Sequence, residues 1–132
     1  MISLNKMLWI GGGLLLADAL TKIMLVTPQW AAHHHTTTWR TQAFVAIGIP
    51  IAFQFVRELR LAGVLLFAGG VGNLISALHG DVQNPFYTQS TSWVMAFNLA
   101  DASIVLGFIL MISALPSVAA RLRKARQRAG VH

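Results

Sequence analysis

The apolar positions of the chain fall into four runs that short polar or charged stretches separate. The runs cover residues 7–26, 41–56, 61–78 and 93–115. A helix needs about 20 apolar residues, with a range of about 17–25, to cross a hydrocarbon core of about 30 Å. Three of the runs meet that length, and 41–56 falls just below it. The pattern predicts an all-α integral membrane protein with four transmembrane helices.

The connecting segments indicate how these helices are oriented. Eight of the ten lysines and arginines fall on one side: Lys6, Arg57, Arg60 and five near the C-terminus. Segments that remain in the cytoplasm carry an excess of these residues. We therefore expect both termini and the short turn at 57–60 to be cytoplasmic. The two polar loops, 27–40 and 79–92, are then expected to face outward.

Composition supports a membrane protein and argues against nucleic-acid binding. Hydrophobic residues make up 55% of the chain and charged residues 11%, whereas a soluble domain carries about a quarter charged residues. The net charge is +6, but half of the basic residues lie within residues 121–132. Such a run fixes topology and attracts anionic headgroups. We predict a transmembrane domain over 1–120, a basic cytoplasmic tail over 121–132, membrane lipids as partners and no nucleic acid.

Cofactor and metal chemistry receives little support from the sequence. The chain has no cysteine, which excludes disulfides, thiolate nucleophiles and cysteine-based metal sites. Imidazole is a common metal ligand, and His33, His34 and His35 are consecutive. Three consecutive side chains of an extended segment cannot all face one ion, and no Cys, Asp or Glu lies nearby. We predict a solvated loop there, with no metal site and no cofactor.

Three ionisable residues fall inside the apolar runs: Asp18, Lys22 and Asp101. Each costs roughly 2.5–3.5 kcal/mol on insertion scales, so each is a functional candidate. Asp18 and Lys22 are four residues apart and share a helix face. With Asp101, which we place two turns into the fourth run, and with Asn73 and Ser76, they predict a polar cluster beneath the outer surface. The alternative is that Asp18 and Lys22 only neutralise each other and support helix packing.

Three blocks of the sequence resemble conserved blocks of the signal peptidase II family, the lipoprotein signal peptidases. Residues 18–22 (Asp-Ala-Leu-Thr-Lys) are similar to the family's first block, Asp-x-x-Ser/Thr-Lys. Residues 97–104 (Phe-Asn-Leu-Ala-Asp-Ala-Ser-Ile) resemble its last block almost residue for residue. Residues 69–74 resemble the start of its Gly-Asn-x-x-Asp-Arg block. The resemblance assigns binding or structural positions to Asp18, Lys22, Asn73, Asn98 and Ser103.

The resemblance also implies a reaction. In that family two aspartates near the outer surface, the dyad, activate a water that cuts a signal peptide before a diacylglyceryl-modified cysteine. One carboxylate takes the proton of the water while the other, protonated, polarises the scissile carbonyl. Asp101 matches the second dyad position. The family's Gly-x-Val-Val-Asp-Phe block aligns with residues 80–85, which puts Asn84 at the first dyad position. An amide cannot take up that proton.

Two further blocks depart from the family pattern. Ser76 and Ala77 replace the Asp-Arg pair of the third block. Residues 39–44 correspond to the family's Asn-x-Gly-Ala-Ala-Phe block, with Trp39 where the family has asparagine. Fold-defining positions are thus kept, whereas positions of chemistry and substrate binding are replaced.

We therefore predict a non-catalytic, signal peptidase II-like protein of the bacterial inner membrane. It is expected to bind a lipid, a lipopeptide or another integral membrane protein, as an accessory subunit of a membrane complex. The alternative is an active, divergent lipoprotein signal peptidase, an aspartic endopeptidase. In that case Asp101 would work with Asp81, which lies three residues before Asn84. A transporter or channel subunit is not favoured, because no run carries a repeated polar face.

Overall fold

The computed structural model describes residues 3–32 and 43–130 and confirms an all-α membrane fold. Three helices in this part of the chain are long and apolar enough to cross a membrane. They are α1 (Leu4–Met24), α4 (Arg60–Leu78) and α5 (Leu99–Arg128). The second apolar run gives a shorter helix, in which a π-helical segment, Phe44–Gly48, continues into α3 (Ile49–Phe53). Single 3₁₀ turns lie at Gln29–Ala31 and Arg57–Leu59.

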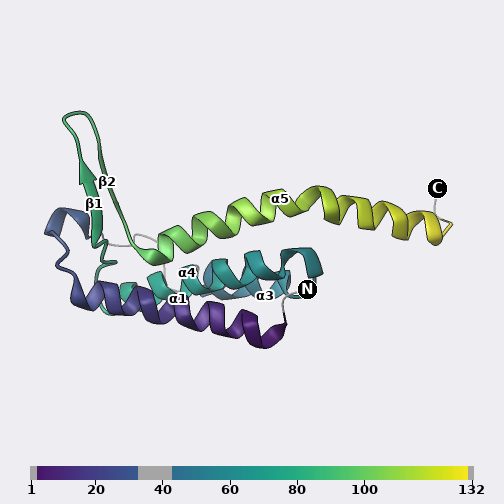
Figure 1. Cartoon of the computed structure of the whole chain (residues 1–132), viewed down its shortest axis with the longest axis horizontal. Helices are drawn as coiled ribbons and strands as arrows, with labels where there is room; N and C mark the ends of the chain where they lie inside the picture. The colour runs from purple at the N-terminus through teal and green to yellow at the C-terminus, as the bar shows by residue number, and fades with distance from the viewer. Residues whose placement is uncertain (1–2, 33–42, 131–132) are drawn as a thin grey trace.

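Helix α4 is the centre of the bundle and contacts α1, α3 and α5 (Figure 1). Glycines on α4 and α5 bring these two helices close together. A Cβ on Gly69 would lie 2.6 Å from Cγ1 of Ile104, and one on Gly107 would lie 2.8 Å from Cγ of Leu66. Both separations are shorter than real Cβ contacts, so a larger residue would push the helices apart. The glycines of the third run therefore serve close helix packing, as small residues commonly do in membranes.

The prediction that the fourth helix begins at Trp93 is wrong. Residues 93–97 belong instead to an antiparallel hairpin of β1 (Phe86–Gln89) and β2 (Val94–Phe97), with Phe86 opposite Phe97. Helix α5 begins only at Leu99, because Asn98 caps it. A short apolar segment does not by itself distinguish a strand from a helix. The hairpin stands away from the helices at one end of the bundle, which we call the hairpin end (Figure 1).

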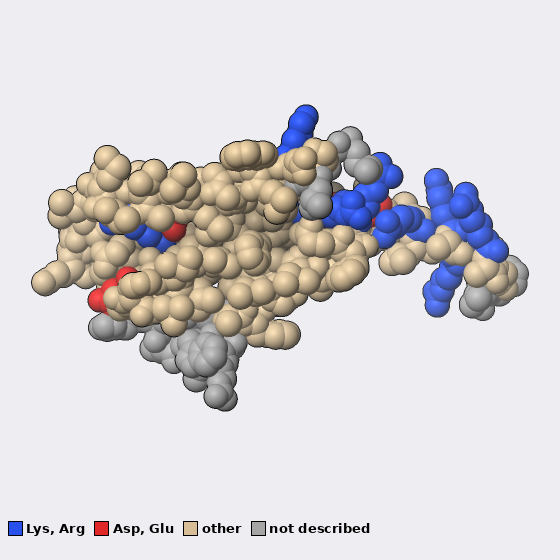
Figure 2. All heavy atoms as spheres, turned by 90° about the horizontal axis from the view of Figure 1, so that it is seen from below, with Lys and Arg blue, Asp and Glu red and all other residues tan. Residues whose placement is uncertain are grey.

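The prediction that the fourth helix ends before Pro116 is also wrong. Helix α5 continues through Pro116 and the basic residues to Arg128, and projects past the bundle (Figure 1). Arg121 forms an ion pair with Glu58 (3.2 Å), which connects α5 to the turn before α4. Figure 2 shows Lys and Arg side chains gathered at this end of the molecule, which we call the basic end. The division into a domain and a tail at residue 120 stays a prediction.

Candidate functional site

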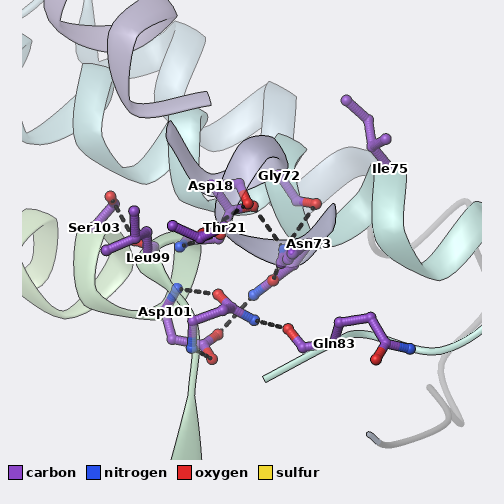
Figure 3. Close-up of polar contacts among 12 residues, drawn as sticks. Asp18, Thr21, Gly72, Asn73, Ile75, Gln83, Leu99, Asp101 and Ser103 are labelled. Atoms are coloured by element: carbon purple, nitrogen blue, oxygen red, sulfur yellow. Dashed lines mark hydrogen bonds and ion pairs between the residues drawn. The ribbon is translucent and has the colours of Figure 1, made fainter. Parts of the chain in front are cut away.

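Polar side chains of α1, of α4 and of the start of α5 lie close together at the hairpin end of the bundle, and Figure 3 labels Asp18, Asn73 and Asp101 among them. We call this cluster the polar layer; it consists of Asp18, Lys22, Asn73, Asn98 and Asp101. The structure thus brings together the ionisable residues that the sequence singled out. Asp101 differs from the prediction in depth, because it lies in the first turn of α5 rather than two turns inside it.

The Asp18–Lys22 ion pair is the buried part of the polar layer. Lys22 Nζ lies 2.6 Å from Asp18 Oδ2, and the two side chains are 7% and 3% exposed, respectively. Asp18 Oδ1 accepts a hydrogen bond from the backbone N–H of Ala100 (2.9 Å). That N–H belongs to the first turn of α5, where helical N–H groups lack intrahelical partners and favour negative charge. The two residues therefore do more than neutralise each other, because Asp18 also joins α1 to the start of α5.

Asn73 connects the ion pair to Asp101. Its Oδ1 accepts a hydrogen bond from Lys22 Nζ (3.2 Å), and its Nδ2 donates to Asp101 Oδ1 (2.7 Å). Lys22 also donates to the carbonyl oxygen of Gly72 (3.4 Å). Since the amide has one acceptor end and one donor end, these bonds fix its orientation between a cation and a carboxylate.

Asp101 itself is held by the cap of α5. Its backbone N–H donates to Asn98 Oδ1 (2.8 Å), and its Oδ2 accepts from the backbone N–H of Asn98 (3.2 Å). This reciprocal arrangement is a capping box, which satisfies two N–H groups that the helix leaves open. Because Asn73 binds Oδ1, both carboxylate oxygens of Asp101 accept hydrogen bonds from the protein.

Asn84 joins the same network through Asn98. Asn98 Nδ2 donates to Asn84 Oδ1 (2.8 Å) and to the carbonyl oxygen of Gln83 (3.2 Å). Asn98 is 0% exposed and Asn84 is 2% exposed. The segment before β1 is therefore fixed to the cap of α5, and the two residues aligned with dyad positions, Asn84 and Asp101, share the neighbour Asn98.

The other residues singled out from the sequence have different surroundings. Asp81 is half-buried in the segment between α4 and β1. Ser103 is buried and donates to the carbonyl oxygen of Leu99 (2.8 Å), a bond within α5. Ser76 is half-buried near the end of α4. His33, His34 and His35 lie outside the described residues, within which no group of three His, Cys, Asp or Glu is placed to hold a metal ion.

Sequence reasoning missed the cap of α5 and the backbone partners of the polar layer. The pattern Asn98-x-x-Asp101 before an apolar run is the signal that predicts such a cap. The Ala100 N–H and the Gly72 carbonyl could not be predicted in this way. Nearly every residue has a backbone N–H and a backbone carbonyl, so the sequence does not show which of them will bind a side chain.

Comparison with known proteins identifies the family of this chain. A family model described as signal peptidase (SPase) II matches residues 28–116, more than half of the chain. The chain belongs to the signal peptidase II family. The matched region contains Asn73, Asn84, Asn98 and Asp101, and membership together with the apolar helices identifies a bacterial membrane protein.

A solved structure described as a bacterial membrane enzyme, determined by the in meso method at 2.3 Å resolution, has a similar fold. The TM-score is 0.65 with 21% sequence identity, and the match covers 89% of this chain and 92% of that chain. No curated protein sequence matches this member of the signal peptidase II family.

Proposed function

We propose that this protein is a non-catalytic member of the signal peptidase II family that binds a lipid, a lipopeptide or another membrane protein at its hairpin end, as an accessory subunit of a membrane complex. The observation that carries the proposal is the environment of the two aligned dyad positions. One holds Asn84, a buried amide bound to Asn98, and the other holds Asp101, whose two oxygens accept hydrogen bonds from the protein.

Asn84 lacks the chemistry that hydrolysis requires of a dyad residue. A pair of carboxylates supplies a base and an acid because the two cannot both ionise easily. An amide neither accepts the proton of a water nor changes protonation state. Asp101 also has a structural role, since it completes the capping box with Asn98 at the start of α5 and accepts a hydrogen bond from Asn73. These features support binding without cleavage.

The hairpin supplies an apolar surface next to the polar layer. Trp93, Val94 and Met95 are 52%, 53% and 50% exposed, respectively. Strand β2 leads directly into Asn98. An extended peptide can pair with a strand edge, and exposed apolar side chains suit the acyl chains next to it. A diacylglyceryl-modified lipopeptide combines both features and is therefore the ligand that we propose.

Binding tests this proposal independently of cleavage. A fluorescent diacylated lipopeptide should bind the protein in nanodiscs saturably, and the same peptide without acyl chains should not. Met95→Ser should weaken binding about fivefold, because partial burial of one apolar side chain contributes roughly 1 kcal/mol. Leu122→Ser is the matched control, since Leu122 is similarly exposed (59%) at the basic end of α5. Equal binding of the acylated and unacylated peptides would rule out a lipopeptide ligand.

One observation favours the alternative of an active peptidase. Asp81 lies half-buried in the segment that also contains Asn84. A rearrangement of this segment would be needed to bring its carboxylate to the position of Asn84. The Asp81→Asn variant distinguishes the two functions in the cleavage assay described in the Discussion.

We further propose that the protein lies in the inner membrane with both termini in the cytoplasm and the hairpin outside. Basic residues support this orientation, because Arg57 lies in the turn before α4, Arg60 directly follows that turn, and Arg121 pairs with Glu58 of the turn. Cytoplasmic segments carry the excess of lysine and arginine.

Labelling of single cysteines tests the orientation, since the natural chain has none. Gln89 is exposed in β1 and Gln127 is exposed near the end of α5. An impermeant maleimide applied to intact spheroplasts should label Gln89→Cys and leave Gln127→Cys unlabelled until the membrane is lysed. Labelling of Gln127→Cys in intact spheroplasts would mean that the orientation is reversed.

A further inference from the structure

A groove at the basic end lies apart from the polar layer. It has a volume of about 250 Å³ and lies between α1, α3 and α4. Its lining includes Met7, Gly12 and Leu15 of α1, Pro50 and Gln54 of the second helical segment, and Phe67 of α4. Met7 and Gly12 belong to the N-terminal half of α1 and Leu15 lies at its middle, whereas Asp18 and Lys22 belong to its C-terminal half. The two sites are therefore at opposite ends of the bundle.

The lining suits an apolar ligand. Gln54 is the polar side chain of the lining, and its Nε2 donates to the carbonyl oxygens of Pro50 (3.3 Å) and Arg60 (3.4 Å). Its amide N–H groups are thus turned toward backbone rather than offered to a ligand. Because α1 and α4 are long enough to cross the membrane, the groove opens in a region that acyl chains surround.

A single acyl chain suits the groove better than a transmembrane helix does. A helix is about 10 Å in diameter with its side chains, whereas an extended hydrocarbon chain is much narrower. A groove of about 250 Å³ can therefore hold a length of one acyl chain.

Cations lie next to the groove at the basic end. Arg57 is exposed three residues after Gln54, which lines the groove. Arg60 Nε donates to the backbone carbonyl of Gln54 (3.0 Å). The acidic residue of this region, Glu58, lies 3.2 Å from Arg121, which compensates its charge. The charge beside the groove is therefore positive.

We propose that this groove binds one acyl chain of an anionic phospholipid, with the phosphate of its headgroup beside Arg57 and Arg60. The apolar lining accounts for binding of the acyl chain. The cations account for the preference for an anionic headgroup, because clustered Lys and Arg residues attract anionic lipids at membrane surfaces. This site goes beyond the proposed lipopeptide binding, because it lies at the other end of the bundle and involves none of the polar layer.

A pair of neighbouring glycines tests the chain-binding part. A Cβ on Gly12 or on Gly13 would meet nothing within 4 Å, so both positions have room for the start of a side chain, but of the two only Gly12 lines the groove. Purified protein would be incubated with phosphatidylglycerol and lipid adducts counted by native mass spectrometry. Gly12→Leu should reduce the first adduct about tenfold, because the new side chain takes the apolar surface that the lipid would bury. Gly13→Leu should keep it; equal effects of both variants would overturn the proposal.

The headgroup part is tested with phosphatidylcholine carrying the same acyl chains. The natural protein should retain phosphatidylglycerol preferentially. Arg57→Gln should reduce this preference about fivefold, because one attraction for the anionic headgroup is removed. Arg123→Gln with Arg126→Gln, the control at the far end of α5, should leave it unchanged. An unchanged preference in the first variant, or an equal loss in both, would contradict the assignment of the headgroup to the cations beside Gln54.

Discussion

Lys22→Met is expected to destabilise the protein by about 3–5 kcal/mol, because it leaves a buried carboxylate without its cation. Lys22 Nζ lies 2.6 Å from Asp18 Oδ2, and Asp18 is 2% exposed. The substitution also removes the donor to Asn73 Oδ1. Since Asn73 in turn donates to Asp101, the loss reaches all three helices of the polar layer. The free energy of unfolding in detergent is the quantity to measure.

The double variant Asp18→Asn with Lys22→Met should be more stable than Lys22→Met alone. Asparagine at position 18 retains an oxygen that can accept the hydrogen bond from Ala100 N–H, while the unpaired charge is gone. Lys6→Met serves as a control, because Lys6 is exposed at the start of α1. If the single and double variants are equally stable, Asp18 and Lys22 are not energetically coupled.

The sequence predicts much of the polar layer because charges inside apolar runs are costly and therefore stand out. Asp18 and Lys22 share a helix face through their spacing alone, and they form the predicted pair. The signal peptidase II family, now confirmed by the match over residues 28–116, is indicated by the short blocks around Asn73 and Asp101.

The parts that the sequence did not predict depend on whether a segment forms a strand or a helix, and on contacts between segments far apart in the sequence. Residues 93–97 are as apolar as the helix that follows, and hairpin pairing with 86–89 decides their conformation. Asn98 then starts α5, which moves Asp101 to the first turn. The bond between Asn98 and Asn84 joins residues 14 positions apart. This bond depends on the path that the backbone takes between α4 and β1, and a hydropathy pattern does not predict that path.

Absence of cleavage is the second large effect that we expect. With Asn84 at the position that we align with the first dyad aspartate, Asp101 would have no second carboxylate there to share general acid–base catalysis, which is typically worth 10²–10⁴-fold. Asn84→Asp would place a carboxylate beside Asn98 Nδ2, which can donate to it as it donates to Asn84. Ala77 and Trp39 would still stand where the family has arginine and asparagine. We therefore expect at most trace activity from Asn84→Asp.

The cleavage assay tests the central claim most directly. A diacylglyceryl-modified prolipoprotein is incubated in detergent with the natural protein, beside an authentic lipoprotein signal peptidase as positive control, and processing is followed by gel shift. We predict no processing by the natural protein under conditions in which the control converts its substrate. Robust processing that both Asp101→Asn and Asp81→Asn abolish would contradict the non-catalytic function and establish an active peptidase that uses Asp101 with Asp81.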